Sequence, residues 1–312
     1  RRPENVDFTS KLEEDLKRRD FTINAMAYNE KEGLIDLFGG NIDIENKIIK
    51  TVGNPYNRFN EDGLRMIRAI RFSSKLNFKI EDNTLLAIYD NAQIIKNISL
   101  ERITDEFNKI ILSNKPENVI YLFKTKLLNY LNISSEEDEN KIAELYKKIS
   151  ILNKFDKVLV KRLVALDYLI KELNINCNSF CKELVYSKKI IKNHNIILIL
   201  MKEINIKELN KVKVKKILNR IDKSLFEEYL DISRVIYEDE KNFAKIIYIL
   251  KEIEENNECY TVKNLKVNGK DIMALGYENK AVGEILNYLL KEVIIKPGLN
   301  EKSLLIEKIQ EI

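Results

Sequence analysis

Apolar residues recur mostly three and four positions apart over a long part of this sequence, from about Asn60 to Ile312. This spacing places them on one face of an α-helix, so it predicts a series of amphipathic helices. The clearest stripes are Leu64, Ile67 and Ile70; Leu85, Ile88, Ile94 and Ile95; and Ile103, Phe107, Ile110 and Ile111. Polar segments at 134–140, 174–179 and 256–259 are expected to separate further helices.

The residues before this array show a mixed pattern. Short apolar runs at Val6–Phe8, Met26–Tyr28 and Leu34–Leu37 predict strands, and the polar turn between the last two predicts a hairpin. Ser10 and Glu13 have the spacing of a capping box, which predicts a helix that starts at Ser10. The fold class expected from both patterns is therefore mostly α, with a small α/β part followed by an all-helical array.

The composition supports this expectation. Only 9 of the 312 residues are Gly and 4 are Pro, whereas a β-sandwich needs many turns. The chain is 45% hydrophobic and is longer than the roughly 250–300 residues at which a single core tends to divide, so two or more packing units are expected. No apolar run approaches the ~18–20 residues that cross a bilayer, so no membrane association is expected.

Charge and cysteine content say less about the function of the protein than the apolar pattern says about its fold. The balance of 53 Lys and Arg against 49 Asp and Glu identifies no polyanionic partner, so a nucleic-acid site must come from local clusters. The three cysteines, Cys177, Cys181 and Cys259, suggest reduced thiols in a cytoplasmic protein. Cys177 and Cys181 are four apart on one expected helix, but no His lies near them in the sequence, so both are interpreted as structural. His194 is interpreted as an ordinary surface or core histidine.

The first candidate cluster is the segment Arg18–Ala25, where a helix is expected to give way to a strand. Arginines can bind phosphate oxygens in a forked geometry, Asp can accept from a ribose hydroxyl, and Asn can donate or accept. The alternative is a basic helix end that only complements the helix dipole.

The second cluster runs from Arg58 to Phe72. On a continuous helix that begins at Asp62, Arg65 and Arg68 follow along one side, opposite the apolar stripe. Arg71 falls half a turn from Asp62. A charged face of this kind is often only a solvated surface, but three evenly spaced arginines with one carboxylate are less ordinary.

The Asp62–Arg65 pair has a specific chemical capability. A carboxylate accepts from an exocyclic amino group, while a neighbouring guanidinium donates to the adjacent ring nitrogen. Cytosine and adenine both present this edge, whereas guanine and uracil present the reverse. Such a pair could select C or A without a nucleic-acid template, with about 1–3 kcal/mol for each bidentate contact.

Two further segments complete the set. Glu101–Phe107 opens an expected helix after Ser99, and its acidic residues suit the helix dipole, so a bracing role is expected. Val267–Leu286 contains an Asn-Gly turn, a short helix, a Gly stop and a second helix. Lys270 and the helix starts near its glycines could contact phosphate, or the segment could be a plain helical corner.

These segments, in this order, resemble the class II CCA-adding tRNA nucleotidyltransferases and bacterial poly(A) polymerases. Arg18–Ala25 is similar to the family's ribose-recognition motif, and Asp36–Gly40 with Asp43 to its head–neck hinge motif. The segment from Glu61 to Phe72 is similar to the neck helix that selects CTP and ATP. Glu101–Phe107 resembles the helix that supports the neck helix, and Val267–Leu286 resembles the tail.

The resemblance implies a role for each matching residue. It implies that Arg19 contacts the nucleotide, Asp20 the ribose, and Asn24 the sugar or phosphates. Asp62 and Arg65 would pair with the incoming base, and Arg68 and Arg71 would complete the pocket. Lys270 would contact tRNA. The full set of expected binding residues is Arg19, Asp20, Asn24, Asp62, Arg65, Arg68, Arg71 and Lys270.

The resemblance also implies an architecture and an activity. Residues 1–55 would be the end of a nucleotidyltransferase head, 56–133 a neck, 134–255 a helical body, and 256–312 a tRNA-binding tail. The expected activity is addition of CMP and AMP, from CTP and ATP, to the tRNA 3′ end with Mg²⁺. The family's catalytic carboxylate pair lies upstream of the ribose motif, so we expect no catalytic or metal-binding residue here and no activity from these residues alone.

Three alternatives stay open at this point. A poly(A) polymerase and a restricted CC-adding or A-adding enzyme belong to the same family. A catalytically dead tRNA-binding module belongs to a different functional class. Poly(A) polymerases usually carry a long basic C-terminal extension, whereas this sequence ends soon after Leu305.

Overall fold

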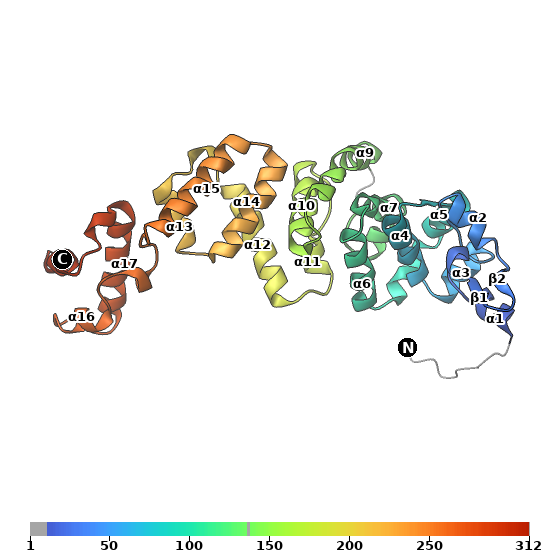
Figure 1. The fold of residues 1–312 in the computed structure, drawn as a ribbon, viewed down its shortest axis with the longest axis horizontal. Helices are drawn as coiled ribbons and strands as arrows, with labels where there is room; N and C mark the ends of the chain where they lie inside the picture. Colours follow the sequence, from blue (N-terminus) through green and yellow to red (C-terminus); the bar gives the residue numbers. More distant parts are fainter. Residues whose placement is uncertain (1–10, 136–137, 312) are drawn as a thin grey trace. The chain divides into compact units, whose positions relative to one another are not determined.

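The structure is a computed structural model that describes residues 11–135 and 138–311, and it divides the chain into two compact units. The first unit is Arg1–Asn195 and the second is Ile196–Ile312. The boundary falls inside one helix, α12 (Lys188–Glu203). Helices dominate both units, and the mostly α fold class expected from the sequence is confirmed (Figure 1). The four-part division into head, neck, body and tail stays a prediction.

The first unit begins with the small α/β part. Helix α1 (Leu12–Lys17) leads into the hairpin of β1 (Met26–Asn29) and β2 (Gly33–Asp36), which pair in antiparallel register with Met26 opposite Asp36. The predicted hairpin is therefore confirmed. The expected strand at Val6–Phe8 and helix start at Ser10 lie outside the described residues.

A second, unpredicted sheet joins this part to the helices that follow. Strands β3 (Ile48–Ile49) and β4 (Lys79–Ile80) pair in parallel. Each strand has two residues, which is too short for a recognisable period in the sequence. The pairing fixes the α/β part against the segment that carries the arginine cluster.

Helix α2 (Gly40–Glu45) begins at the Gly39-Gly40 step. Each of these two positions requires glycine, for a different reason. Gly39 has a φ of 75°, a left-handed conformation that favours glycine. Gly40 has no room for a side chain, because a Cβ there would lie 2.3 Å from the carbonyl oxygen of Thr22. The Thr22 hydroxyl in turn donates to Asp43 of α2 at 2.6 Å. The step therefore holds α2 against the turn that precedes β1.

Asp36 stabilises the start of α2 from outside the helix. Its two carboxylate oxygens accept the backbone N–H groups of Gly40 and Asn41, each at 2.8 Å. Burial alone would raise the pKa of Asp36, but these backbone hydrogen bonds outweigh it, and the pKa lies below its usual value. Asp36 thus serves as an anionic cap for this short helix.

The arginine cluster does not lie on one continuous helix, and this corrects the sequence analysis. Helix α3 (Pro55–Glu61) ends before Asp62, which has extended backbone angles, and α4 (Leu64–Leu76) starts after Gly63. A Cβ at Gly63 would lie 2.9 Å from a methyl carbon of Ile94, a contact that the local pattern cannot reveal. Asp62 therefore sits in the break between two helices. Within α4 the predicted stripe is confirmed, because Leu64, Ile67 and Ile70 are all buried.

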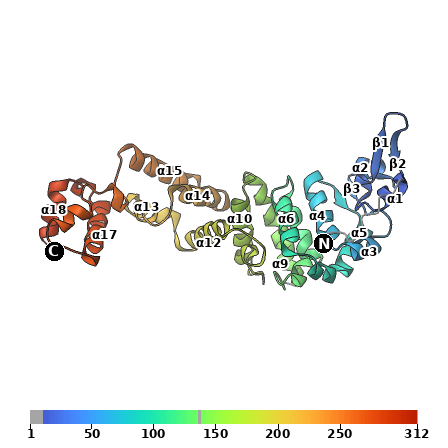
Figure 2. The same ribbon diagram turned by 90° about the horizontal axis from the view of Figure 1, so that it is seen from below.

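The remaining helices of the first unit follow α4 along the chain (Figures 1 and 2). They are α5 (Asp82–Asp90), α6 (Leu100–Ile111), α7 (Ile120–Lys124), α8 (Leu127–Tyr130), α9 (Glu139–Lys148), α10 (Leu159–Glu172) and α11 (Phe180–Glu183). The expected stripe from Leu85 to Ile95 does not form one helix, because α5 ends at Asp90 and a 3₁₀ turn follows. All four apolar residues of the α6 stripe are buried, so that stripe is confirmed.

The cysteines and the histidine also have clear positions. Cys177 precedes α11 and pairs with Ser134 in an isolated bridge, whereas Cys181 lies inside α11, so the two do not share a helix as expected. All three cysteines are free thiols. His194 is fully buried and its Nε2 lies 3.0 Å from the buried carboxylate of Asp167, which gives it a structural role in the core.

The second unit is helical and has its own core. Its helices are α13 (Lys211–Leu218), α14 (Lys223–Tyr237), α15 (Glu240–Glu255), α16 (Gly269–Met273), α17 (Lys280–Ile295) and α18 (Lys302–Gln310). A cluster that includes Val267, Ile272, Leu289 and Ile309 packs with partly buried Val212 of α13. Among the described residues, no helix has the length and hydropathy to cross a membrane.

Candidate functional site

One cavity in the first unit collects most of the residues that the sequence singled out. Its volume is about 510 Å³, and its lining consists of Arg18, Arg19, Asp20, Asn24, Asp62, Arg65 and Arg68. Six of the seven residues expected to bind a nucleotide are in this set, and Arg18 joins them. The lining comes from the end of α1, the turn before β1, the α3–α4 break and α4. Segments about forty residues apart in sequence thus meet around one basic cavity.

Asp20 is the most heavily bonded carboxylate in this lining. It is 9% exposed. Its Oδ1 accepts from the backbone of Phe21 at 3.0 Å and from the side chain of Asn24 at 3.1 Å. Its Oδ2 accepts from Nε of Arg68 at 2.8 Å and from a terminal nitrogen at 2.5 Å. Four donors match the roughly four lone-pair sites of a carboxylate, so Asp20 fixes Asn24 and Arg68 in place.

Arg65 is held by three acceptors. One terminal nitrogen donates to the Arg58 carbonyl at 3.2 Å and to Glu61 at 2.7 Å. The other donates to the Arg18 carbonyl at 3.0 Å. A guanidinium has five N–H bonds, so two remain, and within the described residues they have no acceptor.

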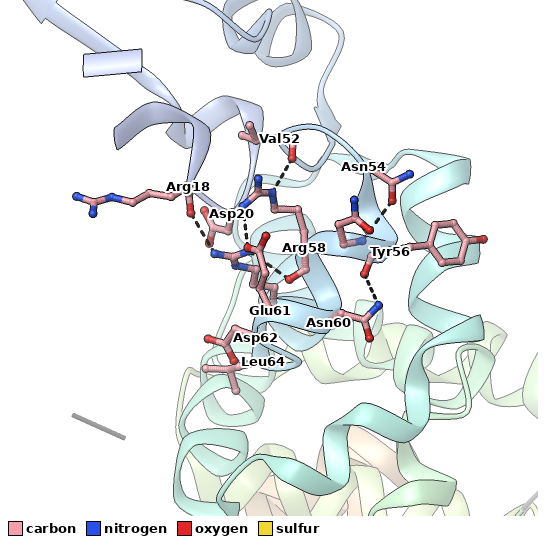
Figure 3. A network of polar contacts seen from close by, with 12 residues as sticks. Arg18, Asp20, Val52, Asn54, Tyr56, Arg58, Asn60, Glu61, Asp62 and Leu64 are labelled. Atoms are coloured by element: carbon pink, nitrogen blue, oxygen red, sulfur yellow. Dashed lines mark hydrogen bonds and ion pairs between the residues drawn. The ribbon is translucent and has the colours of Figure 1, made fainter. Parts of the chain in front are cut away.

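Glu61 is a residue that the sequence analysis missed. Its carboxylate also accepts from Arg58 at 2.7 Å, while Nε of Arg58 donates to the Val52 carbonyl at 3.0 Å (Figure 3). Glu61 therefore joins two arginines at the end of α3. The signal was present, because Glu61 has the i,i+4 spacing to Arg65 that favours an ion pair on a helix.

Asp62 is not paired with Arg65, although both line the cavity. Its Oδ1 accepts from the backbone N–H of Leu64 at 3.1 Å, and its Oδ2 accepts from Arg102 of α6 at 3.0 Å. Half of its acceptor sites therefore stay available. Arg102 lies in the segment expected to brace the neck helix, but sequence reasoning did not find this partner forty residues away.

Arg18 and Arg19 form the exposed side of the cavity. Both donate to Asp15 of α1, Arg18 at 2.5 Å and Arg19 at 2.9 Å. These hydrogen bonds, from Arg19 first and then Arg18, lower the pKa of Asp15. About half or more of each arginine side chain is exposed, so both can turn toward a ligand.

Arg71 lies outside the cavity lining. Its guanidinium pairs with the buried Glu106 of α6 at 2.5 Å and stacks 3.9 Å from the centre of the Phe72 ring. Burial is the main influence on Arg71 and lowers its pKa, whereas Glu106 opposes that shift. The contacts of Arg71 are those of a bracing residue, and a nucleotide contact for it gains no support from this geometry.

Lys270 is exposed in the second unit, at the start of α16. The backbone N–H groups of Lys270 and Asp271 already donate to the side chain of Asn268, at 2.8 and 3.4 Å. The start of α16 therefore offers fewer free N–H groups to a phosphate than the sequence suggested. The Lys270 ammonium itself has no partner among the described residues.

No metal site accompanies these arginines in the described part of the chain. Residues 11–135 and 138–311 contain no group of three or more His, Cys, Asp or Glu side chains arranged to hold a metal ion.

Comparison with known proteins connects this chain to a family. The CCA-adding enzyme of Ligilactobacillus salivarius is 34% identical over 321 residues, and the alignment covers 100% of this chain and 75% of the relative. This chain belongs to the CCA-adding enzyme family. The CCA-adding enzyme of Bacillus subtilis is 32% identical, with 97% of this chain and 74% of the relative covered.

Family models and solved structures agree with this assignment. The family described as "Poly A polymerase head domain" matches residues 1–50, and "Probable RNA and SrmB- binding site of polymerase A" matches residues 77–134. The crystal structure of the Bacillus stearothermophilus CCA-adding enzyme in complex with CTP has a TM-score of 0.75 and 27% identity, and the match covers 98% of this chain and 76% of that one. The family resemblance stated from the sequence is confirmed.

Proposed function

We propose that this chain carries the nucleotide-selecting and RNA-holding parts of an enzyme that adds C and A to the 3′ end of tRNA without a nucleic-acid template. The cavity that unites Asp62 and Arg65 with Arg18, Arg19 and Arg68 is the observation that carries this proposal. Support comes from two relatives named CCA-adding enzymes, and from a third CCA-adding enzyme of similar structure that was solved with CTP.

The remaining hydrogen-bonding capacity at the cavity fits the edge shared by C and A. Asp62 keeps acceptor sites for an exocyclic amino group, and Arg65 keeps two N–H bonds for a ring nitrogen. The acceptors of Arg65 and the backbone contact of Asp62 fix both groups before a base arrives. Uracil and guanine would place an acceptor against Asp62 and a donor against Arg65, so neither hydrogen bond could form.

The arginines of the cavity suit the sugar–phosphate part of a nucleotide. Arg18 and Arg19 are exposed and can reach phosphate oxygens in a forked geometry. The proposed ribose contact of Asp20 requires that one of its four present donors exchange for a hydroxyl. We therefore assign Asp20 mainly to the positioning of Asn24 and Arg68.

For the metal we propose only its identity, and we assign no catalytic acid or metal ligand to this chain. Transfer of a nucleotidyl group uses divalent metal ions in enzymes of this chemistry, and Mg²⁺ is the cofactor that we propose. The described residues do not provide a matching set of ligands, so we assign no metal ligand to this chain and derive no step through the metal. The cytoplasm as location and the division at residues 55, 133 and 255 are likewise proposals.

The test of base selection is nucleotide binding by the chain with Asp62→Ala or Arg65→Ala. Asp62→Ala should weaken CTP and ATP relative to UTP and GTP, and each broken bidentate contact should cost about 1–3 kcal/mol, or tenfold to a hundredfold in affinity. Arg65→Ala should weaken both CTP and ATP. Titration calorimetry with the four nucleotides measures these ratios.

The matched control is Asp82→Ala. Asp82 is an exposed carboxylate of α5 that pairs with Lys79 and lies outside the cavity lining. It should leave all four affinities unchanged. Equal discrimination by the chain with and without Asp62→Ala contradicts the proposal. Binding of ATP without CTP favours a poly(A) polymerase, and binding of tRNA without any nucleotide favours a tRNA-binding module.

A further inference from the structure

The aromatic ring of Phe72 lies beside two arginines of α4. The ring centre is 5.6 Å from the central guanidinium carbon of Arg68 and 3.9 Å from that of Arg71. Both distances lie within the roughly 6 Å over which the negative face of a ring attracts a cation. Arg68 lines the nucleotide cavity, whereas Phe72 does not. An effect of Phe72 on a bound ligand would therefore act through Arg68.

Arg68 uses only part of its hydrogen-bonding capacity inside the protein. Its Nε and one terminal nitrogen both donate to Oδ2 of Asp20, at 2.8 and 2.5 Å. A guanidinium has five N–H bonds, so three remain, and within the described residues they have no acceptor. Because both hydrogen bonds end on one oxygen, the guanidinium can swing about that oxygen. A second contact is needed to fix the direction of the three remaining N–H bonds.

Phe72 supplies this second contact, and its own position depends on Phe21. The two rings meet edge to face, with their centres 5.6 Å apart and their planes at 73°. Phe21 is fully buried, and its backbone N–H donates to Asp20 at 3.0 Å. The carboxylate and the ring that hold Arg68 are therefore both fixed by the same residue.

An ordinary packing role explains only part of these contacts. Phe72 is half-buried, and an aliphatic side chain could cover Phe21 as well as a ring does. The two cations, however, disfavour each other: burial lowers the pKa of Arg71 most, and the positive charge of Arg68 lowers it further. A ring that attracts both cations offsets this repulsion, and an aliphatic side chain does not.

We propose that Phe72 is a positioning residue of the nucleotide cavity, because it fixes the direction in which Arg68 presents its three N–H bonds. The positioning of Arg68 stands on the geometry, whereas the identity of the ligand as a nucleotide rests on the proposed function. The N–H bonds of a guanidinium suit the phosphate oxygens of a nucleotide. Phe72 thus contributes to affinity and leaves the choice of base to Asp62 and Arg65.

The first test measures the affinities for CTP and UTP by calorimetry in F72L, F72Y and F78L. F72L removes the ring but keeps an apolar side chain, whereas F72Y keeps the ring. F78L is the matched control, because Phe78 is also half-buried and has no ring or cation contact within the described residues. F72L should bind CTP roughly two- to fivefold more weakly, as expected for a partly exposed cation–π contact. Its ratio of CTP to UTP affinity should not change, and F72Y and F78L should bind CTP as the unaltered chain does.

A double-mutant cycle separates positioning from general packing. In the chain with Arg68→Ala, F72L should have no further effect on CTP affinity, because the group that the ring positions is absent. In the chain with Asp62→Ala, F72L should keep its full effect, since Asp62 is held by Leu64 and Arg102 instead. Urea denaturation checks that each variant folds. F72M takes the place of F72L if F72L does not fold.

A second measurement needs no ligand. Nuclear magnetic resonance reports how fast the Nε–H of Arg68 exchanges with solvent, and the signal is assigned by its loss in Arg68→Lys. Exchange requires the hydrogen bond to Asp20 to open. Loss of the ring should therefore speed the exchange by about the same two- to fivefold factor. F78L should leave the exchange rate unchanged.

Several results would each overturn the proposal. They are equal loss of CTP affinity in F72L and F78L, a failure of F72Y to keep that affinity, a changed ratio of CTP to UTP affinity in F72L, an undiminished effect of F72L in the Arg68→Ala chain, and an unchanged exchange rate in F72L. If the unaltered chain binds no nucleotide but F72L still speeds the exchange of Arg68, the proposed function fails while the positioning of Arg68 by Phe72 stands.

Discussion

Asp20 shows how a single carboxylate can fix several other side chains in the lining of one cavity. It accepts from the Phe21 backbone, from Asn24 and twice from Arg68, and is almost fully buried. The hydrogen bonds from Arg68 are charge-assisted, which makes them stronger than neutral ones. Removal of this one charge should therefore release side chains from two different elements.

We expect Asp20→Asn to weaken both folding and nucleotide binding. The amide keeps one acceptor oxygen but turns an NH₂ group toward Arg68, so a charged hydrogen bond worth roughly 1.5–3 kcal/mol is removed. Urea denaturation measures the stability, and calorimetry with CTP measures the affinity. Asp15→Asn is the matched control, because Asp15 also accepts charged hydrogen bonds, from Arg18 and Arg19, but is more exposed than Asp20. Equal effects of the two substitutions would contradict the special role of Asp20.

At the scale of elements, the position of the short helix α2 is fixed by a contact that leaves no room for a larger side chain. The start of α2 lies against the Thr22 carbonyl, and a Cβ at Gly40 would overlap it. A backbone atom cannot rotate away as a side chain can. The position of α2, and with it the turn that carries Asn24, therefore depends on the absence of one methyl group.

We expect Gly40→Ala to destabilise the chain by about 1–3 kcal/mol, the usual cost of an overpacked site. Gly283→Ala is a matched control with the opposite sign. Gly283 lies inside α17, and nothing is within 4 Å of its added Cβ. Alanine there should stabilise the chain by about 0.4–1 kcal/mol. Thermal and urea denaturation of both variants test this contrast, and a neutral Gly40→Ala would show that α2 can shift freely.

Glu258 joins α13 to the segment after α15 through a buried ion pair. Its partner Lys215 is 1% exposed, and Lys211 also contacts Glu258. Burial raises the pKa of Glu258, but the hydrogen bonds from the two lysines outweigh this effect and leave it below the ordinary value. A carboxylate with a lowered folded-state pKa stabilises the fold above its unfolded pKa and stops doing so as pH falls through the folded-state pKa.

We therefore expect the stability of the second unit to decline as pH drops below the ordinary Glu value of 4.5 toward the lowered value. Glu258→Gln should remove most of this dependence. It should also cost roughly 3–5 kcal/mol at neutral pH, because Lys215 would keep its charge without a partner. Urea titrations between pH 3 and pH 7, about the range in which carboxylates titrate, provide the measurement. A variant with the same pH profile as the unaltered chain would exclude Glu258 as the source.

Across the whole molecule, the sequence predicted what depends on local spacing and missed what depends on distant contacts. The stripes of α4 and α6 and the β1–β2 hairpin follow from periods of three to four or two residues, and all are present. The break at Asp62 was missed because it depends on Gly63 packing on Ile94. The partners of Asp62 and Arg71, both on α6, were missed because they are more than thirty residues away.

The residues of the cavity were predictable for a different reason. Their types and order match a family motif, so the resemblance identified them without any knowledge of their contacts. It could not show that Asp20 is already saturated or that Arg71 faces Glu106, since those facts depend on side-chain geometry.

The position of Asp62, in a break between two helices and tied by the backbone of Leu64, has a consequence for how information is stored. Under the proposed function, Asp62 and Arg65 form a template of one letter that does not move as the product grows. Such a template distinguishes C and A from G and U. It makes the same contacts with C and with A, and these contacts do not depend on how many nucleotides have been added. The order of the added nucleotides, and the point at which addition stops, must therefore be set by the space that the lengthening RNA leaves in the cavity.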